Sequence, residues 1–88
     1  MDLTKQQPRP GSEKLGEWAW LPRMIDKARA KYQGNIGEYA HPCGRDRMLL
    51  AELGISAEEF REVIENTETD AEVLRALEDR RAAAEADS

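Results

Sequence analysis

A short loop holds the residues of this chain that are best suited to chemistry. It reads His-Pro-Cys-Gly-Arg-Asp over residues 41–46, and Cys43 is the single cysteine of the 88-residue sequence. We expect a helix to begin near Arg45, which would place Cys43 at its positively polarised end, where free backbone N–H groups favour an anion. Arg45, Arg47 and His41 add positive charge, and positive charge favours a thiolate over a thiol. The loop therefore predicts a candidate reactive thiol: a redox sensor, an intermolecular disulfide partner or a nucleophile.

The same loop has more ordinary interpretations. Free cysteines are among the most buried residues, so Cys43 could simply close the loop onto the core. His41 and Asp46 could act on Cys43 as base and orienting group only if the loop brought all three within hydrogen-bond reach. A metal would find at most three ligands in one copy of the loop, so a tetrahedral site would need a second copy. We therefore predict no catalytic constellation, no metal site and no cofactor.

A second candidate site lies on a helix predicted from Pro22 to about Gln33. Proline suits the first position of a helix, and Gly34 suits a left-handed stop. Apolar residues recur along one face, and the cations recur four residues apart on the opposite face, which predicts an outward-facing basic stripe. The apolar face contains Leu21, Met24, Ile25, Ala28 and Tyr32. The candidate binding residues of this helix and the following loop are Arg23, Asp26, Lys27, Arg29, Lys31 and Tyr39.

Asp26 adds an alternative to the basic stripe. It precedes Arg29 by three residues, within pairing range on a helix. A charged cluster that also includes Tyr39 and Asp46 is the alternative. An ion-pair network that fixes helix and loop accounts for such a cluster better than a binding pocket does.

Length and composition set limits on what holds these residues in place. Eighty-eight residues build one domain, and one cysteine permits no disulfide within the chain. A chain of this size is close to the lower limit for a self-sufficient core, so we expect a protein partner or self-association, with a homodimer as one form. The first ten residues lack the apolar stretch of a signal peptide, and no apolar run is long enough for a membrane span. We therefore expect a cytoplasmic protein with no membrane partner.

Charge is divided unevenly along the chain. Residues 1–47 hold nine Lys and Arg against six Asp and Glu, whereas residues 48–88 hold four against twelve. The balances of +3 and −8 sum to the net charge of −5. An acidic chain is a poor nucleic-acid binder, because phosphate contacts need clustered cations. A nucleic-acid accessory role would therefore depend on the basic helix alone. We favour instead the acidic tract from Glu58 to Asp79 as the partner of that helix, contacted within the domain or across a dimer.

Local signals predict an all-α fold, a small bundle of about four helices with an irregular N-terminal arm. The arm covers residues 1–12, a single helical domain covers 13–80, and a fraying tail covers 81–88. A second helix is expected from about Arg45 to Leu53. Capping boxes at Ser56 with Glu59 and at Thr69 with Glu72 open two more. The predicted core contains Leu15, Trp20, Leu21, Ile25, Ala28, Tyr32, Leu49, Leu53, Phe60, Val63, Ile64, Val73, Leu74 and Leu77.

Several segments in this order and spacing resemble one known family. They are residues 2–30 (DLTKQQPRPGSEKLGEWAWLPRMIDKARA), GNIGEY at 34–39, the single cysteine, LGISAEEFREVI at 53–64 and TDAEVLRAL at 69–77. Together they resemble the bacterial family known as domain of unknown function 5069. Around Cys43 the chain departs from the aromatic-x-Cys-Pro-Leu-Asp pattern, although Cys43 and Asp46 keep their places. The resemblance implies no activity, cofactor or partner.

The residues favour a non-enzymatic interaction module that acts through the basic helix and the Cys43 loop. This interpretation depends on the lack of a complete catalytic constellation and on the uneven charge. A thiol-dependent redox or catalytic protein centred on Cys43 is the alternative. A nucleic-acid accessory protein is a third possibility, and it requires an exposed and contiguous basic stripe.

Overall fold

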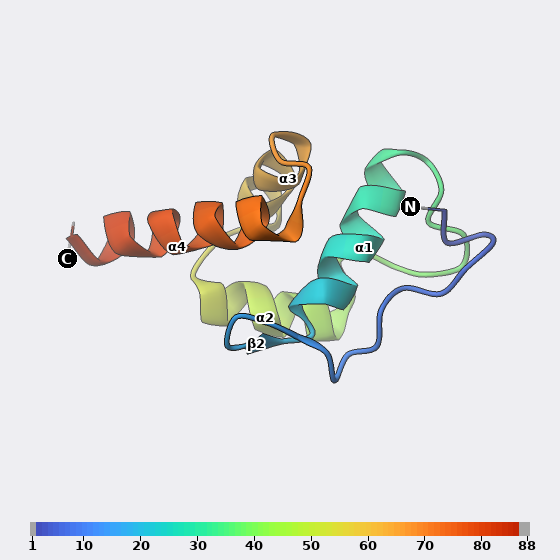
Figure 1. Cartoon of the computed structure of the whole chain (residues 1–88), viewed down its shortest axis with the longest axis horizontal. Helices are drawn as coiled ribbons and strands as arrows, with labels where there is room; N and C mark the ends of the chain where they lie inside the picture. The colour runs from blue at the N-terminus through green and yellow to red at the C-terminus, as the bar shows by residue number, and fades with distance from the viewer. Residues whose placement is uncertain (1, 87–88) are drawn as a thin grey trace.

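The computed structural model describes residues 2–86 of the chain, and the side chains of residues 2–83. Two short strands, β1 (Lys14–Leu15) and β2 (Trp18–Ala19), precede four helices (Figure 1). The helices are α1 (Leu21–Tyr32), α2 (Gly44–Leu53), α3 (Ala57–Glu65) and α4 (Asp70–Ala86). The four predicted helices are confirmed. The predicted tail over residues 81–88 is helical as far as Ala86, and residues 87 and 88 lie outside the described part.

The small hairpin is a departure from a purely α-helical fold. β1 and β2 are antiparallel, with Lys14 opposite Ala19 and Leu15 opposite Trp18. Two-residue strands are too short for an alternating apolar pattern, so the sequence offers no period by which to recognise them. The hairpin supplies Trp18 and leads directly into Trp20, and both side chains pack against the helical core.

Side-chain caps fix the starts of α3 and α4 as the sequence predicts. The backbone N–H of Glu59 donates to Ser56 Oγ at 3.1 Å, and Ser56 N–H donates to Glu59 Oε1 at 3.3 Å. Thr69 and Glu72 make the same reciprocal pair, with both backbone bonds at 3.2 Å. Each pair satisfies amide groups that the first turn of a helix leaves without partners. Both predicted capping boxes are confirmed.

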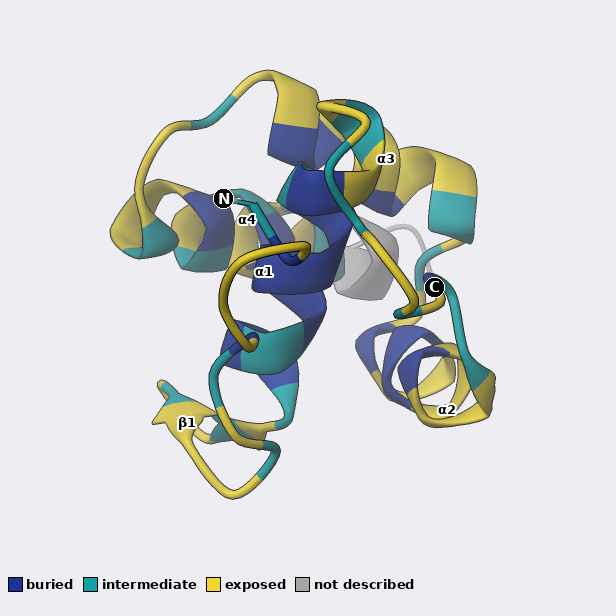
Figure 2. Cartoon of the chain, turned by 90° about the vertical axis from the view of Figure 1, so that its right-hand side faces the viewer, coloured by how far each residue is buried: buried dark blue, intermediate teal, exposed yellow. Residues whose placement is uncertain are grey.

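Helix α1 is the central element of the fold, and most of its surface is covered (Figure 2). Leu21, Met24, Ile25 and Ala28 are at most 1% exposed and pack into a core completed by Phe60 of α3 and by side chains of α2 and α4. Four predicted core residues lie partly exposed against this core: Leu15, Trp20, Tyr32 and Leu74. Buried Met24, Leu50, Leu3 and Ala30 were absent from the predicted core.

The N-terminal arm is tied down along α1. Leu3 is buried, and its backbone N–H donates to the carbonyl of Asn35 at 2.8 Å. The Arg9 guanidinium lies between two carboxylates, with Nη2 3.0 Å from Asp26 Oδ1 and Nη1 2.5 Å from Asp70 Oδ2. This guanidinium holds the pKa of Asp70 below its usual range. Arg9 therefore connects the arm to α1 and to the start of α4.

The arm also crosses the ring of Trp20, where no larger residue would fit. A Cβ atom added to Gly11 would lie 2.3 Å from the Trp20 ring, so only glycine allows the backbone to approach this closely. Trp20 itself has a φ of 73°, a left-handed conformation that non-glycine residues rarely adopt. This conformation turns the chain from the hairpin into α1 and directs the indole toward α2.

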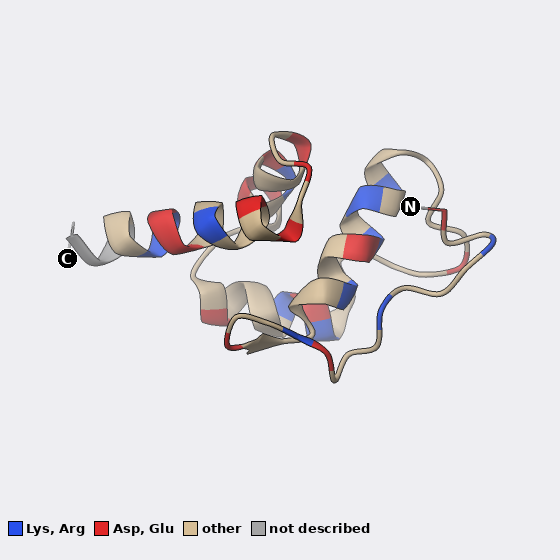
Figure 3. Cartoon of the chain, viewed as in Figure 1, with Lys and Arg blue, Asp and Glu red and all other residues tan. Residues whose placement is uncertain are grey.

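The charge asymmetry of the sequence persists in the folded chain (Figure 3). Carboxylates predominate on α3 and at the start of α4, whereas Lys and Arg predominate on the arm and α1. In the described part of the chain, no helix is both long and apolar enough to cross a membrane. The fold therefore presents an acidic region and a more basic region, which meet where Arg9 pairs with Asp70.

Candidate functional site

A fully buried carboxylate, Asp46, is the centre of the site. Asp46 is 0% exposed and lies in the first turn of α2. Trp20 Nε1 donates to its Oδ1 at 2.7 Å. Lys27 Nζ at 2.8 Å, His41 Nδ1 at 3.0 Å and the backbone N–H of Cys43 at 3.0 Å converge on its Oδ2. One side chain thus joins the hairpin exit, α1, the loop and α2.

These contacts decide the protonation state of Asp46. Burial raises the pKa of this carboxyl group, but the hydrogen bonds from His41, Lys27, Trp20 and the Cys43 backbone outweigh it and hold the pKa far below its usual range. Asp46 is therefore ionised whenever the protein is folded near neutral pH. A buried ionised carboxylate needs a counter-charge, because an unpaired charge in the interior is strongly unfavourable.

Lys27 supplies that counter-charge, and it corrects our prediction of an outward-facing Lys27. Its residue exposure is 3%, so it belongs to the interior and not to a solvated basic stripe. The helical period predicts which residues share a face, but it does not predict what covers the flank of that face. Here Trp20 and the start of α2 cover the flank, and Asp46 draws the ammonium group inward.

The Cys43 thiol shares the same lysine. Lys27 Nζ lies 3.1 Å from Cys43 Sγ. An ammonium group has three hydrogens, so it can donate to Asp46 and to Sγ and also face the Trp20 ring. Cys43 is the N-cap residue of α2, in extended backbone, and is partly exposed. A buried ammonium and the free amides of a ten-residue helix therefore both face the sulfur.

His41 positions the loop, and among the described residues its ring makes no hydrogen bond to the Cys43 thiol. Its Nδ1 must carry a hydrogen, because the Asp46 carboxylate that it meets can only accept. Its Nε2 is buried without a hydrogen-bond partner among the described residues, and the ring packs between Tyr32 and Phe60 at centroid distances of 6.2 and 5.9 Å. The peptide bond between His41 and Pro42 is cis. His41 therefore orients Asp46 and anchors the loop in the core.

The chain was compared with known protein families. The family model described as domain of unknown function (DUF5069) matches residues 5–88. The chain belongs to this family. A search of curated proteins found no match to it. The DUF5069 assignment confirms the family resemblance in the sequence, and the function of the site has to be argued from the chemistry of its residues.

The remaining cations of α1 in this DUF5069 chain are engaged within the fold. Arg23 lies over the rings of Trp20 and Tyr39, at 5.3 and 5.7 Å, and donates to the Arg9 carbonyl. Arg29 donates to the carbonyls of Ile64 and Thr67 at 3.2 and 3.0 Å.

Lys31 is exposed, as predicted, but its Nζ donates to the His41 carbonyl at 2.5 Å. The cations of α1 therefore bind arm, loop and α3, and they do not form one free stripe.

The charged residues predicted to cluster fall into two separate networks. Lys27 and Asp46 belong to the network around Cys43, whereas Asp26 pairs with Arg9 and, through it, with Asp70. Arg45 and Arg47 are exposed beside Cys43 on the first turn of α2, where Arg45 also lies 5.5 Å from the Trp20 ring. Within the described residues, no group of three or more His, Cys, Asp and Glu could hold a metal ion.

The depressed pKa of Asp46 predicts a specific loss of stability in acid. A carboxyl whose folded pKa lies below its unfolded value, about 3.9, stabilises the fold above that value. That contribution falls as the pH drops toward the folded pKa. We expect the free energy of unfolding, measured with urea from pH 7 to pH 2, to decline below about pH 4 by up to roughly 1.4 kcal/mol per pH unit for this group.

A paired variant isolates Asp46 from the other carboxyls. Lys27→Met with Asp46→Asn removes the buried ion pair and the titrating group together, so the acid slope should be shallower than in the wild type. Asp79→Asn, on the exposed surface of α4, is the control and should leave the slope unchanged. An identical slope in the wild type and the paired variant would show that Asp46 does not titrate in this way.

Proposed function

We propose that the protein acts through Cys43 as a redox-responsive thiol that forms mixed disulfides with acidic low-molecular-weight disulfides. The observation that carries this proposal is the 3.1 Å contact between the buried Lys27 ammonium and Cys43 Sγ. A thiolate is the attacking species in disulfide exchange, and neighbouring positive charge favours it. Asp46 fixes the lysine in place, and Cys43 is a partly exposed residue at the start of α2.

The reaction is a single exchange at one sulfur. The Cys43 thiolate attacks one sulfur of a disulfide, the old S–S bond breaks, a new bond to Cys43 forms, and the other half leaves as a thiolate. No second cysteine in this sequence can resolve the product, so an external thiol must reverse it. This is a stoichiometric modification of the protein, in keeping with the prediction of a non-enzymatic role.

The preference for an acidic reagent comes from the surface around the sulfur. Arg45 and Arg47 are exposed on the first turn of α2, next to Cys43, and helix N-termini favour anions. Oxidised glutathione carries carboxylates and is therefore a suitable probe. We expect incubation at pH 7.5 to add one glutathione per chain, detected by intact-protein mass spectrometry and reversed by dithiothreitol.

Two variants distinguish the electrostatic attraction of the acidic reagent from the reactivity of the Cys43 sulfur. Arg45→Ala with Arg47→Ala should slow glutathione addition about threefold at low salt and slow alkylation by neutral iodoacetamide less, because only the charged reagent is attracted by the two arginines. Cys43→Ser should give no adduct. Failure of the folded wild type to react with oxidised glutathione, under conditions in which the urea-unfolded chain reacts, would contradict the proposal.

Protein binding is the second candidate function. The surface that would bind the partner is the acidic surface of α3, and not the basic helix α1. The cations of α1 are buried or engaged, so the predicted interaction through them lacks a free surface. Exposed carboxylates instead cover α3 and the following turn: Glu58, Glu59, Glu62, Glu65 and Glu68. Three of them pair with exposed or partly exposed arginines on the same surface, Glu59 and Glu62 with Arg80 and Glu65 with Arg61, and the surface keeps a net negative charge. Such a surface repels phosphate and attracts basic protein segments, which makes a nucleic-acid partner a poor fit.

A further inference from the structure

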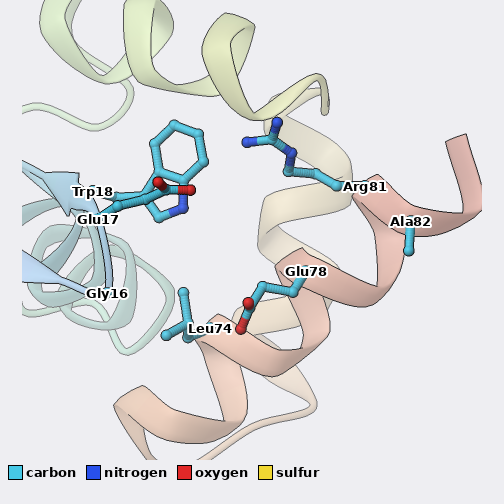
Figure 4. A pocket seen from close by; sticks show the side chains of 7 residues that line it. All are labelled: Gly16, Glu17, Trp18, Leu74, Glu78, Arg81 and Ala82. Atoms are coloured by element: carbon cyan, nitrogen blue, oxygen red, sulfur yellow. The ribbon is translucent and has the colours of Figure 1, made fainter. Parts of the chain in front are cut away.

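A groove between the hairpin and α4 has the chemistry of a binding site that is separate from Cys43. Its volume is about 350 Å³, and it opens to solvent between Gly16, Glu17 and Trp18 on one side and Leu74, Glu78 and Arg81 on the other (Figure 4). The hairpin contributes an aromatic wall, and α4 contributes an apolar floor at Leu74 with charged groups above it. The groove therefore combines one aromatic face, one apolar contact and charges of both signs.

The aromatic wall already carries a guanidinium group. The Arg81 guanidinium carbon lies 4.9 Å from the centroid of the Trp18 ring, within the range of a cation–π interaction. Trp18 is partly exposed, and its ring points into the groove toward α4 (Figure 4). The geometry shows that this ring face can accept a planar cation, and in the free chain Arg81 provides it.

The two carboxylates of the groove lack partners within the described chain. Glu17 and Glu78 are both exposed, and neither side chain makes a hydrogen bond or an ion pair with another described residue. They approach the groove from opposite walls, Glu17 beside the Trp18 ring and Glu78 from α4 (Figure 4). The charges of Glu17, Glu78 and Arg81 sum to −1, so the groove has a net negative charge.

We propose that this groove binds an arginine side chain of a basic partner protein. The guanidinium of the partner would stack on Trp18 in competition with Arg81, pair with Glu17 and Glu78, and lay its aliphatic stem on Leu74. A guanidinium suits this combination because it is planar, always charged, and able both to stack and to donate several hydrogen bonds. The excess negative charge of residues 48–88 would attract the same partner over a longer range.

This inference rests on the second candidate function, protein binding, and does not depend on the Cys43 thiol. The probe is N-acetyl-arginine amide, and its uncharged isostere N-acetyl-citrulline amide is the matched control. In the ¹⁵N-labelled protein, we expect arginine amide to shift the Trp18 indole N–H signal in a saturable way and citrulline amide to shift it little.

Variants locate the site. Glu17→Gln with Glu78→Gln should weaken binding about fivefold or more, and Trp18→Leu should weaken it by a similar factor. Arg81→Ala removes the internal competitor and should strengthen binding severalfold. Asp79→Asn, beside the groove but not lining it, controls for the loss of one charge on α4.

The outcomes distinguish this proposal from the thiol proposal. Cys43→Ser should bind arginine amide as the wild type does, whereas glutathione addition should be unchanged in the Glu17→Gln, Glu78→Gln variant. Equal shifts with the arginine and citrulline probes, or unchanged affinity in the double glutamine variant, would overturn the groove assignment. Neither result would contradict the proposed thiol chemistry of Cys43.

Discussion

Replacing Asp46 with alanine should lower the free energy of unfolding by about 3–5 kcal/mol, because it leaves a buried lysine without its counter-charge. Lys27 is 3% exposed, and its ammonium lies 2.8 Å from the carboxylate that would be removed. The indole N–H of Trp20 and the backbone N–H of Cys43 would lose their acceptor as well. Since small domains have a total stability of roughly 0.05–0.15 kcal/mol per residue, this loss is a large fraction of the stability of the chain. Urea unfolding followed by circular dichroism measures it.

The paired variant Lys27→Met, Asp46→Asn provides the control for that prediction. Removing both charges avoids the unpaired buried ammonium, and asparagine keeps a carbonyl oxygen as an acceptor. We therefore expect the paired variant to recover at least half of the stability lost by Asp46→Ala. A paired variant as unstable as the single variant would show that the other hydrogen bonds to Asp46, and not the ion pair, dominate its contribution.

The same paired variant should lower the reactivity of Cys43 about tenfold at pH 7. Loss of Lys27 removes the ammonium that lies 3.1 Å from the sulfur, and a hydrogen bond from a charged donor contributes about 1.5–3 kcal/mol. About 1.4 kcal/mol corresponds to one factor of ten. The rate of iodoacetamide alkylation, measured by mass spectrometry under conditions in which circular dichroism shows a folded protein, gives the comparison.

Lys14→Met is the matched control for the reactivity prediction. Lys14 is exposed on β1, and its replacement removes one positive charge without touching the network around Asp46. Its alkylation rate should stay within about twofold of the wild type, since screened charges on the surface have little effect at a distance. Equal rates in the wild type, the Lys14→Met variant and the paired variant would mean that Lys27 does not act on the sulfur.

Local signals were sufficient to predict the helices. The capping boxes at Ser56 and Thr69 depend only on residues three positions apart, and both form as predicted. The hairpin was missed because two-residue strands have no period. Trp20 in a left-handed conformation likewise depends on the fit of the arm against its ring, which no local pattern records.

The site was predicted in part, and its most important pair was not. The sequence predicts Cys43 at a helix start and Asp46 as a possible neighbour in the same loop, whereas it predicts an outward-facing Lys27 that the structure shows to be buried. Helical period alone puts Lys27 with Lys31, and only the tertiary contact with Asp46 at the start of α2 distinguishes the buried lysine from the exposed one. A useful signal was available in hindsight: an aspartate three residues after the N-cap can bond the N-cap amide, as Asp46 does.

The most direct test of the central claim compares the alkylation rate of Cys43 by iodoacetamide at pH 7 in the folded protein and in the urea-unfolded chain. If Lys27 and the start of α2 activate the sulfur, the folded protein should react faster, although folding shields part of the side chain. A folded protein that reacts more slowly than the unfolded chain would identify Cys43 as an ordinary structural cysteine and contradict the account.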